Sequence, residues 1–296
     1  MIEPRRHRDT ETILSPLCIC VSVAFSLCVS IVSASPTVHV GKLDVVHFKS
    51  RMLNAVRTVR VWLPPGFNRH TRYAVLYLND GQNLFGDGDP ESGGGGWHVD
   101  ETAARLIEAH QIVPLMVVGI DSGDDRSRAA DYLPVADPFS DDPDAPRADD
   151  YLAFLVSELI PFVERKYPAR SEPEARGFGG SSYGAASAFY AIMARPGVFG
   201  RVLLESPSVG VGNGLLLDRA RAVSRWPGRV VMGIGTGEGR GGRPAAFQTL
   251  VDVLHGAGLG DDRLKVVVQE GGRHNEESWA TRLPDALAMM KNETEW

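Results

Sequence analysis

The chain has 296 residues, of which 43 % are hydrophobic and 23 % are charged, and its formal net charge is −6. This composition is ordinary for a soluble globular protein, and the length fits one large α/β domain or two small ones. The negative charge, with no block of lysine or arginine after the first ten residues, excludes a nucleic-acid-binding role.

The N-terminus has the pattern of an export signal. Arg5, Arg6 and Arg8 precede an apolar run over residues 17–32, and small residues follow up to Ala34. We expect a signal peptide over residues 1–34, cleaved after Ala34, and an exported protein that is free of the membrane after cleavage. An uncleaved membrane anchor is the alternative. All three cysteines lie in this leader, so a mature chain of residues 35–296 would have no disulfide and no thiolate metal site.

Strand and helix patterns alternate along the rest of the chain. Strands are expected at residues 37–48, 56–63, 74–78, 114–120, 175–179, 201–205, 228–234 and 264–269. Helices are expected at residues 100–109, 149–166 with a kink at Pro161, 185–195, 245–255 and 283–291. This order predicts a single α/β domain over residues 35–296, built on a mostly parallel sheet of about eight strands with helices on both faces.

Two loops are expected to lie beside a ligand site. The polar turn from Asn79 through Asp80 to Gln82 follows a buried strand, and ligands of open α/β sheets bind at the carboxyl ends of strands. A glycine-rich loop over residues 92–97 lacks the Lys-Ser/Thr of a phosphate loop, and we interpret it as a flexible segment anchored by Trp97. Residues 121–148 are rich in Asp, Pro, Ser and Arg and are expected to form a long surface loop that walls a cleft.

The most specific motif is Gly180-Ser181-Ser182-Tyr183-Gly184, which has the form G-x-S-x-G. It lies between a predicted strand and a predicted helix, as in the strained turn that presents a nucleophilic serine. Glycine is required two residues either side of the serine because a side chain there would collide with the crossing strand and helix. Ser182 is therefore the candidate nucleophile.

A serine hydroxyl needs a base, and the base needs an acid to orient it. His274 is the candidate base because it follows both the motif and the last predicted strand; His255 is the rival but falls in a predicted helix. Glu238 follows the strand that ends near residue 235 and is the candidate acid, with Glu205 as the alternative.

An oxyanion formed during acyl transfer needs two backbone N–H donors. We expect one from Tyr183, at the start of the helix after the serine, and one from Gln82, with Gly81 as the next choice. No metal site is expected: the chain has no H-E-x-x-H pattern, and the acidic residues 141–144 lie in a proline-rich stretch that we interpret as solvated.

Taken together, these motifs resemble those of a known family, the α/β-hydrolase esterases that include enterochelin esterases, feruloyl and acetyl-xylan esterase domains and the mycolyltransferases. The resemblance covers nearly all of residues 56–290. It rests on residues 61–66, 76–82, Trp97 with Asp100, Arg128 with Asp131 and Tyr132, residues 179–184, 235–238, and 274–276 with Trp279. The resemblance implies serine ester hydrolysis without metal or cofactor, and it puts Ser182, Glu238 and His274 on the family's triad positions. Asp131 stands where many relatives have glutamate.

The resulting hypothesis is an exported serine esterase that forms an acyl-enzyme on Ser182 and acts on a small-molecule or carbohydrate-linked ester. Trp97, Asp80 and Tyr132 are the candidates for substrate contact. Acyl transfer to a sugar or another alcohol on the same triad is one alternative, and a non-catalytic binding module on a hydrolase fold is another. The sequence leaves the ester open between siderophore lactones, feruloyl or acetyl carbohydrate esters and lipid esters.

Overall fold

The structure is a computed structural model that describes residues 40–86, 88, 95–123, 125–137, 145–239 and 243–291. The predicted signal peptide, the first residues of the glycine-rich loop and the acidic stretch 141–144 lie outside the described residues. None of the helices within these ranges is both long enough and apolar enough to span a membrane.

An eight-stranded sheet forms the centre of the domain, in the order β1-β2-β4-β3-β5-β6-β7-β8. Only the pairings β1/β2 and β2/β4 are antiparallel, and the strands from β4 to β8 run in parallel. The bounds are β1 (Lys42–Ser50), β2 (Ala55–Leu63), β3 (Ala74–Asn79), β4 (Leu115–Ile120), β5 (Arg176–Ser181), β6 (Arg201–Glu205), β7 (Arg229–Gly235) and β8 (Leu264–Gln269). The predicted α/β-hydrolase architecture, with about eight mostly parallel strands, is confirmed.

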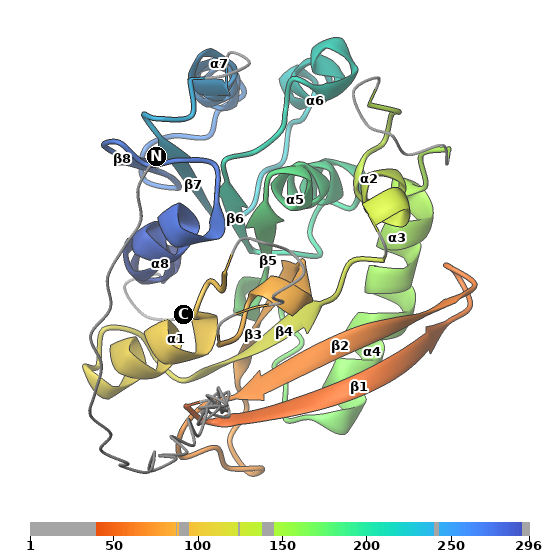
Figure 1. Cartoon of the computed structure of the whole chain (residues 1–296), viewed down its shortest axis with the longest axis vertical. Helices are drawn as coiled ribbons and strands as arrows, with labels where there is room; N and C mark the ends of the chain where they lie inside the picture. Colours follow the sequence, from red (N-terminus) through yellow and green to blue (C-terminus); the bar gives the residue numbers. More distant parts are fainter. Residues whose placement is uncertain are drawn as a thin grey trace, which may run out of the picture. The chain divides into compact units, whose positions relative to one another are not determined.

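Helices cover both faces of the sheet (Figure 1). On one face, α1 (Val99–Glu108) and α8 (Glu276–Met290) pack over apolar side chains such as Leu76 and Leu203. On the other face, a larger apolar cluster includes α3 (Ala148–Phe154), α4 (Ile160–Lys166), α5 (Tyr183–Ala194), α6 (Val211–Arg221) and α7 (Arg243–Gly256). The central strands are buried on both sides, which explains why β3 and β4 are continuous apolar runs.

Four features of the helices differ from the expectations. Residues 125–132, expected as loop, form α2 (Asp125–Tyr132), and α6 was not predicted. The expected helix over residues 149–166 is divided by a π-helical segment, Leu155–Leu159, which ends just before Pro161. The closing helix begins at Glu276, because Asn275 caps it by accepting a hydrogen bond from the Ser278 amide at 3.2 Å, and Pro284 lies inside the helix.

The polar sequence of α2 gave no helical signal. Ion pairs with other parts of the chain hold this helix in place. Asp131 is 1 % exposed and accepts hydrogen bonds from Arg57 on β2 and from Arg147 at 2.7 Å. On the same helix, the Arg128 guanidinium binds both oxygens of Asp80, at 2.7 and 2.8 Å. Local propensity is weak in such a segment, and the tertiary contacts decide its structure.

We predict that Asp131→Ala destabilises the protein by about 3–5 kcal/mol, because it leaves the buried Arg57 cation without its partner. Urea unfolding of the variant and its parent measures this difference. Asp150→Ala, which removes an exposed carboxylate on α3, is the matched control and is expected to change the unfolding free energy by less than about 0.5 kcal/mol. Equal effects of the two substitutions would contradict the structural role of Asp131.

Candidate active site

A cavity of about 370 Å³ lies at the carboxyl ends of the parallel strands. The chain crosses from β3 to β4 on one side and returns to β5 on the other, so the loops after β3 and β5 diverge and leave a crevice there. The cavity is lined by Asp80, Gln82, Asn83, Trp97, Ser122, Arg128, Ser181, Ser182, His274, Glu276 and Trp279. Ser182 and His274, which were predicted to act together, are thus brought to one cavity.

Ser182 occupies a strained turn between β5 and α5, with φ 54° and ψ −118°. A non-glycine residue at this positive φ is rare, and such strain is found at sites where the surrounding structure fixes it. A Cβ added at Gly180 would lie 2.9 Å from the backbone carbon of Gly184, and one at Gly184 would lie 3.0 Å from Asn79 Cβ. The two glycines of the motif are therefore required by close packing.

The Ser182 hydroxyl is held at the cavity wall beside a second serine. Its Oγ lies 3.3 Å from Ser208 Oγ, and the Ser208 amide donates to the Ser182 carbonyl at 3.2 Å. Within the described residues the Ser182 hydroxyl has Ser208 as its hydrogen-bond partner, and no hydrogen bond joins Ser182 to His274. Catalytic hydrogen bonds are often loose before substrate binds.

His274 is hydrogen bonded to Glu238, with Nδ1 2.8 Å from Oε2. The other carboxylate oxygen accepts hydrogen bonds from Ser206 Oγ at 2.7 Å and from the Gly235 amide at 2.9 Å. Burial alone would raise the pKa of Glu238, but these hydrogen bonds outweigh it and lower the pKa below the ordinary glutamate value. A charged Glu238 orients the imidazole so that Nε2 is the nitrogen left for chemistry.

The two expected oxyanion donors lie at helix N-termini. Tyr183 is the first residue of α5, and Gln82 is the second residue of a short 3₁₀ turn over Gly81–Asn83. The first amides of a helix have no partner within it, and neither of these two has another partner in the described part of the chain. Both amides are thus available to a bound oxygen atom.

The expected substrate-contact residues divide into two groups. Asp80 and Trp97 line the cavity, and Asp80 is held there by Arg128. Tyr132 does not line it: the side chain is 1 % exposed, packs against Tyr151 and accepts a hydrogen bond from the Asp80 amide. The assignment of Tyr132 to substrate contact is corrected accordingly, because its hydroxyl is used to fix the turn after β3.

Glu205 and His255 were the alternative acid and base. Glu205 is paired with Arg282, whose Nε lies 2.8 Å from Oε2, and it does not contact His274. His255 is an exposed residue of α7, 3.0 Å from Asp261, and does not line the cavity. No group of His, Cys, Asp or Glu with the geometry of a metal site occurs among the residues described above.

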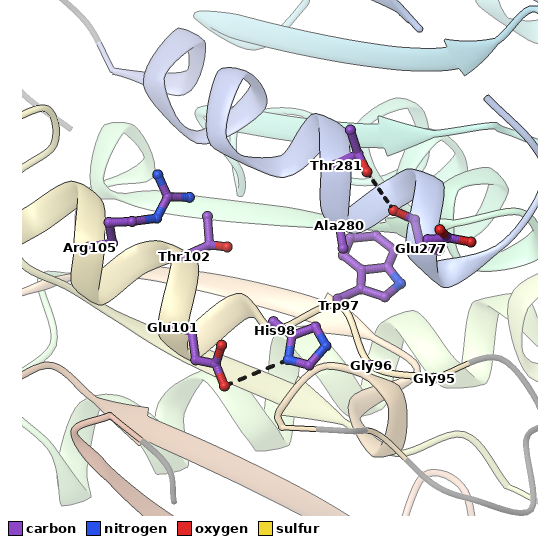
Figure 2. A pocket seen from close by; sticks show the side chains of 10 residues that line it. All are labelled: Gly95, Gly96, Trp97, His98, Glu101, Thr102, Arg105, Glu277, Ala280 and Thr281. Carbon is purple, nitrogen blue, oxygen red and sulfur yellow. Dashed lines mark hydrogen bonds and ion pairs between the residues drawn. The ribbon is translucent and has the colours of Figure 1, made fainter. Parts of the chain in front are cut away.

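A second cavity, of about 620 Å³, lies between α1 and α8 (Figure 2). Its lining mixes hydroxyl, carboxylate, guanidinium and imidazole groups: Thr102, Thr281, Glu101, Glu277, Arg105 and His98. Trp97 lines this cavity as well as the first one, and its ring packs at 5.7 Å from that of Trp279. The second cavity contains neither Ser182 nor His274.

Comparison with known families decides the classification. Residues 50–290 match the sequence model of a family named Esterase and described as "Putative esterase". The chain belongs to the esterase family. It is accordingly classed as a carboxylic ester hydrolase.

Curated relatives of this esterase include two uncharacterized proteins of Bacillus subtilis. YjcH is 27 % identical over 169 residues, which are 57 % of this chain and 63 % of YjcH. YbbA is 23 % identical over 246 residues, covering 79 % of this chain and 92 % of YbbA. The esterase thus matches less than two thirds of the length of YjcH but nearly all of YbbA.

Solved structures share the fold of this esterase at low sequence identity. A ferulic acid esterase superposes with a TM-score of 0.64 at 20 % identity, covering 86 % of this chain and 98 % of that one. The enterochelin esterase of Shigella flexneri gives 0.67 at 23 % identity, over 86 % of this chain and 60 % of the other. A siderophore hydrolase of Aspergillus nidulans gives 0.64 at 18 % identity, over 86 % and 95 % of the two chains.

Sequence reasoning gave Ser206 and Arg282 no role beside the His274–Glu238 pair, and it used Trp279 only as part of the family resemblance. Ser206 and Arg282 contact Glu238, and Trp279 packs edge-on against His274 at 5.2 Å between ring centroids. Asn79, in the polar turn expected beside the ligand site, links the end of β3 to the start of α5 through a 2.8 Å hydrogen bond to the Gly184 carbonyl. Arg282 gave no signal in the sequence, because its burial, which requires buried carboxylates nearby, is visible only in the structure.

The lowered pKa of Glu238 makes a prediction about stability. A depressed pKa adds stability above the ordinary glutamate value of 4.5, and this contribution is lost as the pH falls through the folded-state value. Glu238→Gln should therefore reduce the free energy of unfolding more at pH 7 than at the lowest pH at which both proteins fold. Urea unfolding at the two pH values measures this, and a difference that does not change with pH would contradict it.

Proposed function

We propose that the protein is an exported serine esterase in which Ser182 is the nucleophile, His274 the general base and Glu238 the acid that orients it. The observation that carries the proposal is the 2.8 Å bond between His274 and buried Glu238, with His274 lining the same cavity as the strained Ser182. Family membership supports ester hydrolysis. The roles of the individual residues are inferred from their chemistry and geometry.

In the first step Ser182 Oγ attacks the ester carbonyl carbon, and its proton passes to Nε2 of His274. Glu238 stabilises the imidazolium that forms, and the amides of Tyr183 and Gln82 hold the negative oxygen of the tetrahedral intermediate. Collapse of the intermediate expels the alcohol, which takes the proton from His274. Water then attacks the acyl-enzyme by the same route and releases the acid.

The proposed substrate is a small-molecule or carbohydrate-linked ester. The lining of the catalytic cavity is largely polar, with Asp80, Arg128 and Glu276 beside Trp97 and Trp279, which suits an ester that carries hydrogen-bonding groups. A Shigella flexneri enterobactin esterase of the same fold was solved in the presence of enterobactin. The second cavity, which shares Trp97 with the first, offers room for a part of the substrate that does not react.

The Tyr183 side chain borders the nucleophile. Its hydroxyl donates to Asp137, and the Arg128 guanidinium lies 5.5 Å from its ring centroid. Burial, together with the bond to Asp137, raises the pKa of Tyr183 to about 12, so the phenol stays protonated at neutral pH. In the proposed mechanism Tyr183 contributes its amide, and its ring is anchored away from the reacting carbonyl.

The nucleophile is tested by fluorophosphonate labelling beside hydrolysis of short p-nitrophenyl esters. We expect Ser182→Ala to abolish labelling and to lower kcat by about 10⁶-fold, the scale of triad removal in other serine hydrolases. His274→Ala should also lose labelling, because the hydroxyl is then no longer deprotonated. Near-normal turnover by Ser182→Ala would overturn the proposal, and a folded parent that is never labelled would favour a binding module.

Product analysis with acceptor sugars separates hydrolysis from transfer. In their presence we expect free acid as the product, because water completes the proposed cycle. Accumulation of acylated sugar would instead assign the acyl-enzyme to a transferase.

We also propose that the leader is removed on export. Expression of the full chain in a secreting host should give a mature protein that begins at Ser35, because small residues precede that position. Intact-mass measurement of the exported protein reads the N-terminus directly. A protein that retains residues 1–34 and sediments with membranes would contradict cleavage and indicate an anchor.

A further inference from the structure

Glu238 can serve His274 only if its carboxylate is held in one orientation. The carboxylate is buried, and Oε2 faces His274 while Oε1 faces Ser206 and the Gly235 amide. Gly235 ends β7, three residues before Glu238, so its bond to Glu238 closes a local turn on one strand end. Ser206 belongs to a different strand end, immediately after β6, and can fix Glu238 relative to the rest of the sheet.

The direction of the Ser206 hydrogen bond is set by its neighbours. Ser206 Oγ accepts from Trp279 Nε1 at 2.9 Å and from the Arg282 guanidinium at 3.1 Å. A hydroxyl has two acceptor lone pairs and one proton. Because both lone pairs face donors that cannot accept, the Ser206 proton is left for Glu238 Oε1, 2.7 Å away.

Arg282 is itself locked by three partners. It donates to Glu205 Oε2 at 2.8 Å, to Gln269 Oε1 at 2.9 Å and to Ser206 Oγ. Gly233 leaves the space that this arrangement needs, since a Cβ there would lie 2.2 Å from Glu205 Oε2. The Ser206 backbone is strained as well, with φ 46°, and its amide is fixed by the Gly233 carbonyl at 2.8 Å.

We propose that Ser206 is a positioning residue for the reaction: it holds the Glu238 carboxylate through a hydroxyl that Trp279 and Arg282 point in one direction. This inference rests on the proposed function of Ser182, His274 and Glu238. Ser206 does not line the cavity and acts on the reaction through Glu238. Its hydrogen bond is also among the interactions that lower the pKa of Glu238.

The charged groups around the pair come from several elements. Arg282 on α8 lies 3.9 Å from Glu238, and Glu205 on β6 balances its charge. Glu276 lines the cavity near His274 and accepts a hydrogen bond from Asn83. Asp80 and Arg128 also line the cavity and neutralise each other in a direct ion pair. Replacing Ser206 changes none of these charges, so its effect reports the hydrogen bond itself.

The test compares Ser206→Ala and Ser206→Gly with the parent. Both remove the hydroxyl, but glycine accepts the positive φ without strain, so Ser206→Gly remains informative if the alanine variant folds poorly. We expect both to lower kcat by about 10- to 100-fold with KM within about twofold, because a hydrogen bond to a charged group is lost. The far-downfield proton resonance of the His274–Glu238 bond should shift or broaden in both.

Ser50→Ala is the matched control. Ser50 Oγ donates to the buried carboxylate of Glu158 at 2.7 Å, the same chemical arrangement on a different part of the sheet. This variant should leave kcat and the His274 resonance unchanged. It thereby separates the specific role of Ser206 from the general loss of a buried hydroxyl.

Two results would overturn the inference: parent-like kcat and resonance in both Ser206 variants, or full recovery of kcat in Ser206→Gly. The second result would show that backbone geometry, and not the hydroxyl, matters. Failure of the proposed function is distinguishable, because it would leave the parent unlabelled by fluorophosphonate. The resonance of the His274–Glu238 bond needs no turnover, so in that case it still reports whether Ser206 holds Glu238 in place.

Discussion

The arrangement at the edge of the sheet that carries Ser182 and His274 depends on one requirement, that a carboxylate removed from water stays charged. Glu238 is 3 % exposed, and an isolated carboxylate in such a place would take up a proton. Three hydrogen bonds and a nearby guanidinium keep its negative charge favourable. Each donor comes from a different stretch of chain, so the charge can be accommodated only when β6, β7, β8 and α8 are assembled together.

Paired charges also hold the segments around Asp80 and α2. Arg128 pairs with Asp80 and Asp131 with Arg57 and Arg147, which joins segments far apart in the sequence. Asp80 and Arg128 line the cavity and form a bidentate pair, while the Asp131 pairs lie behind them and hold α2 in place. The apolar clusters lie below, on the two faces of the sheet, and leave the crevice at its edge to polar groups.

Much of this could be predicted from the sequence, for physical reasons that differ between elements. Buried parallel strands such as β3 and β4 are continuous apolar runs, and the close packing around Ser182 demands glycines at fixed spacing. The α2 helix had no such signal, since ion pairs with residues 16 to 74 positions away hold it. Ser206 could not be found either, because an ordinary serine gains its importance only from Trp279 and Arg282, which approach it across the sheet.

The tilted indole pair of Trp97 and Trp279 has an optical consequence. Two rings with centroids 5.7 Å apart, tilted at 49°, are close enough to couple as chromophores, and Trp279 in turn touches the His274 ring. The near-ultraviolet circular dichroism of the protein should thus carry a signal that originates beside His274. Because Trp97 borders both cavities, occupancy of either one becomes visible in the spectrum without any label.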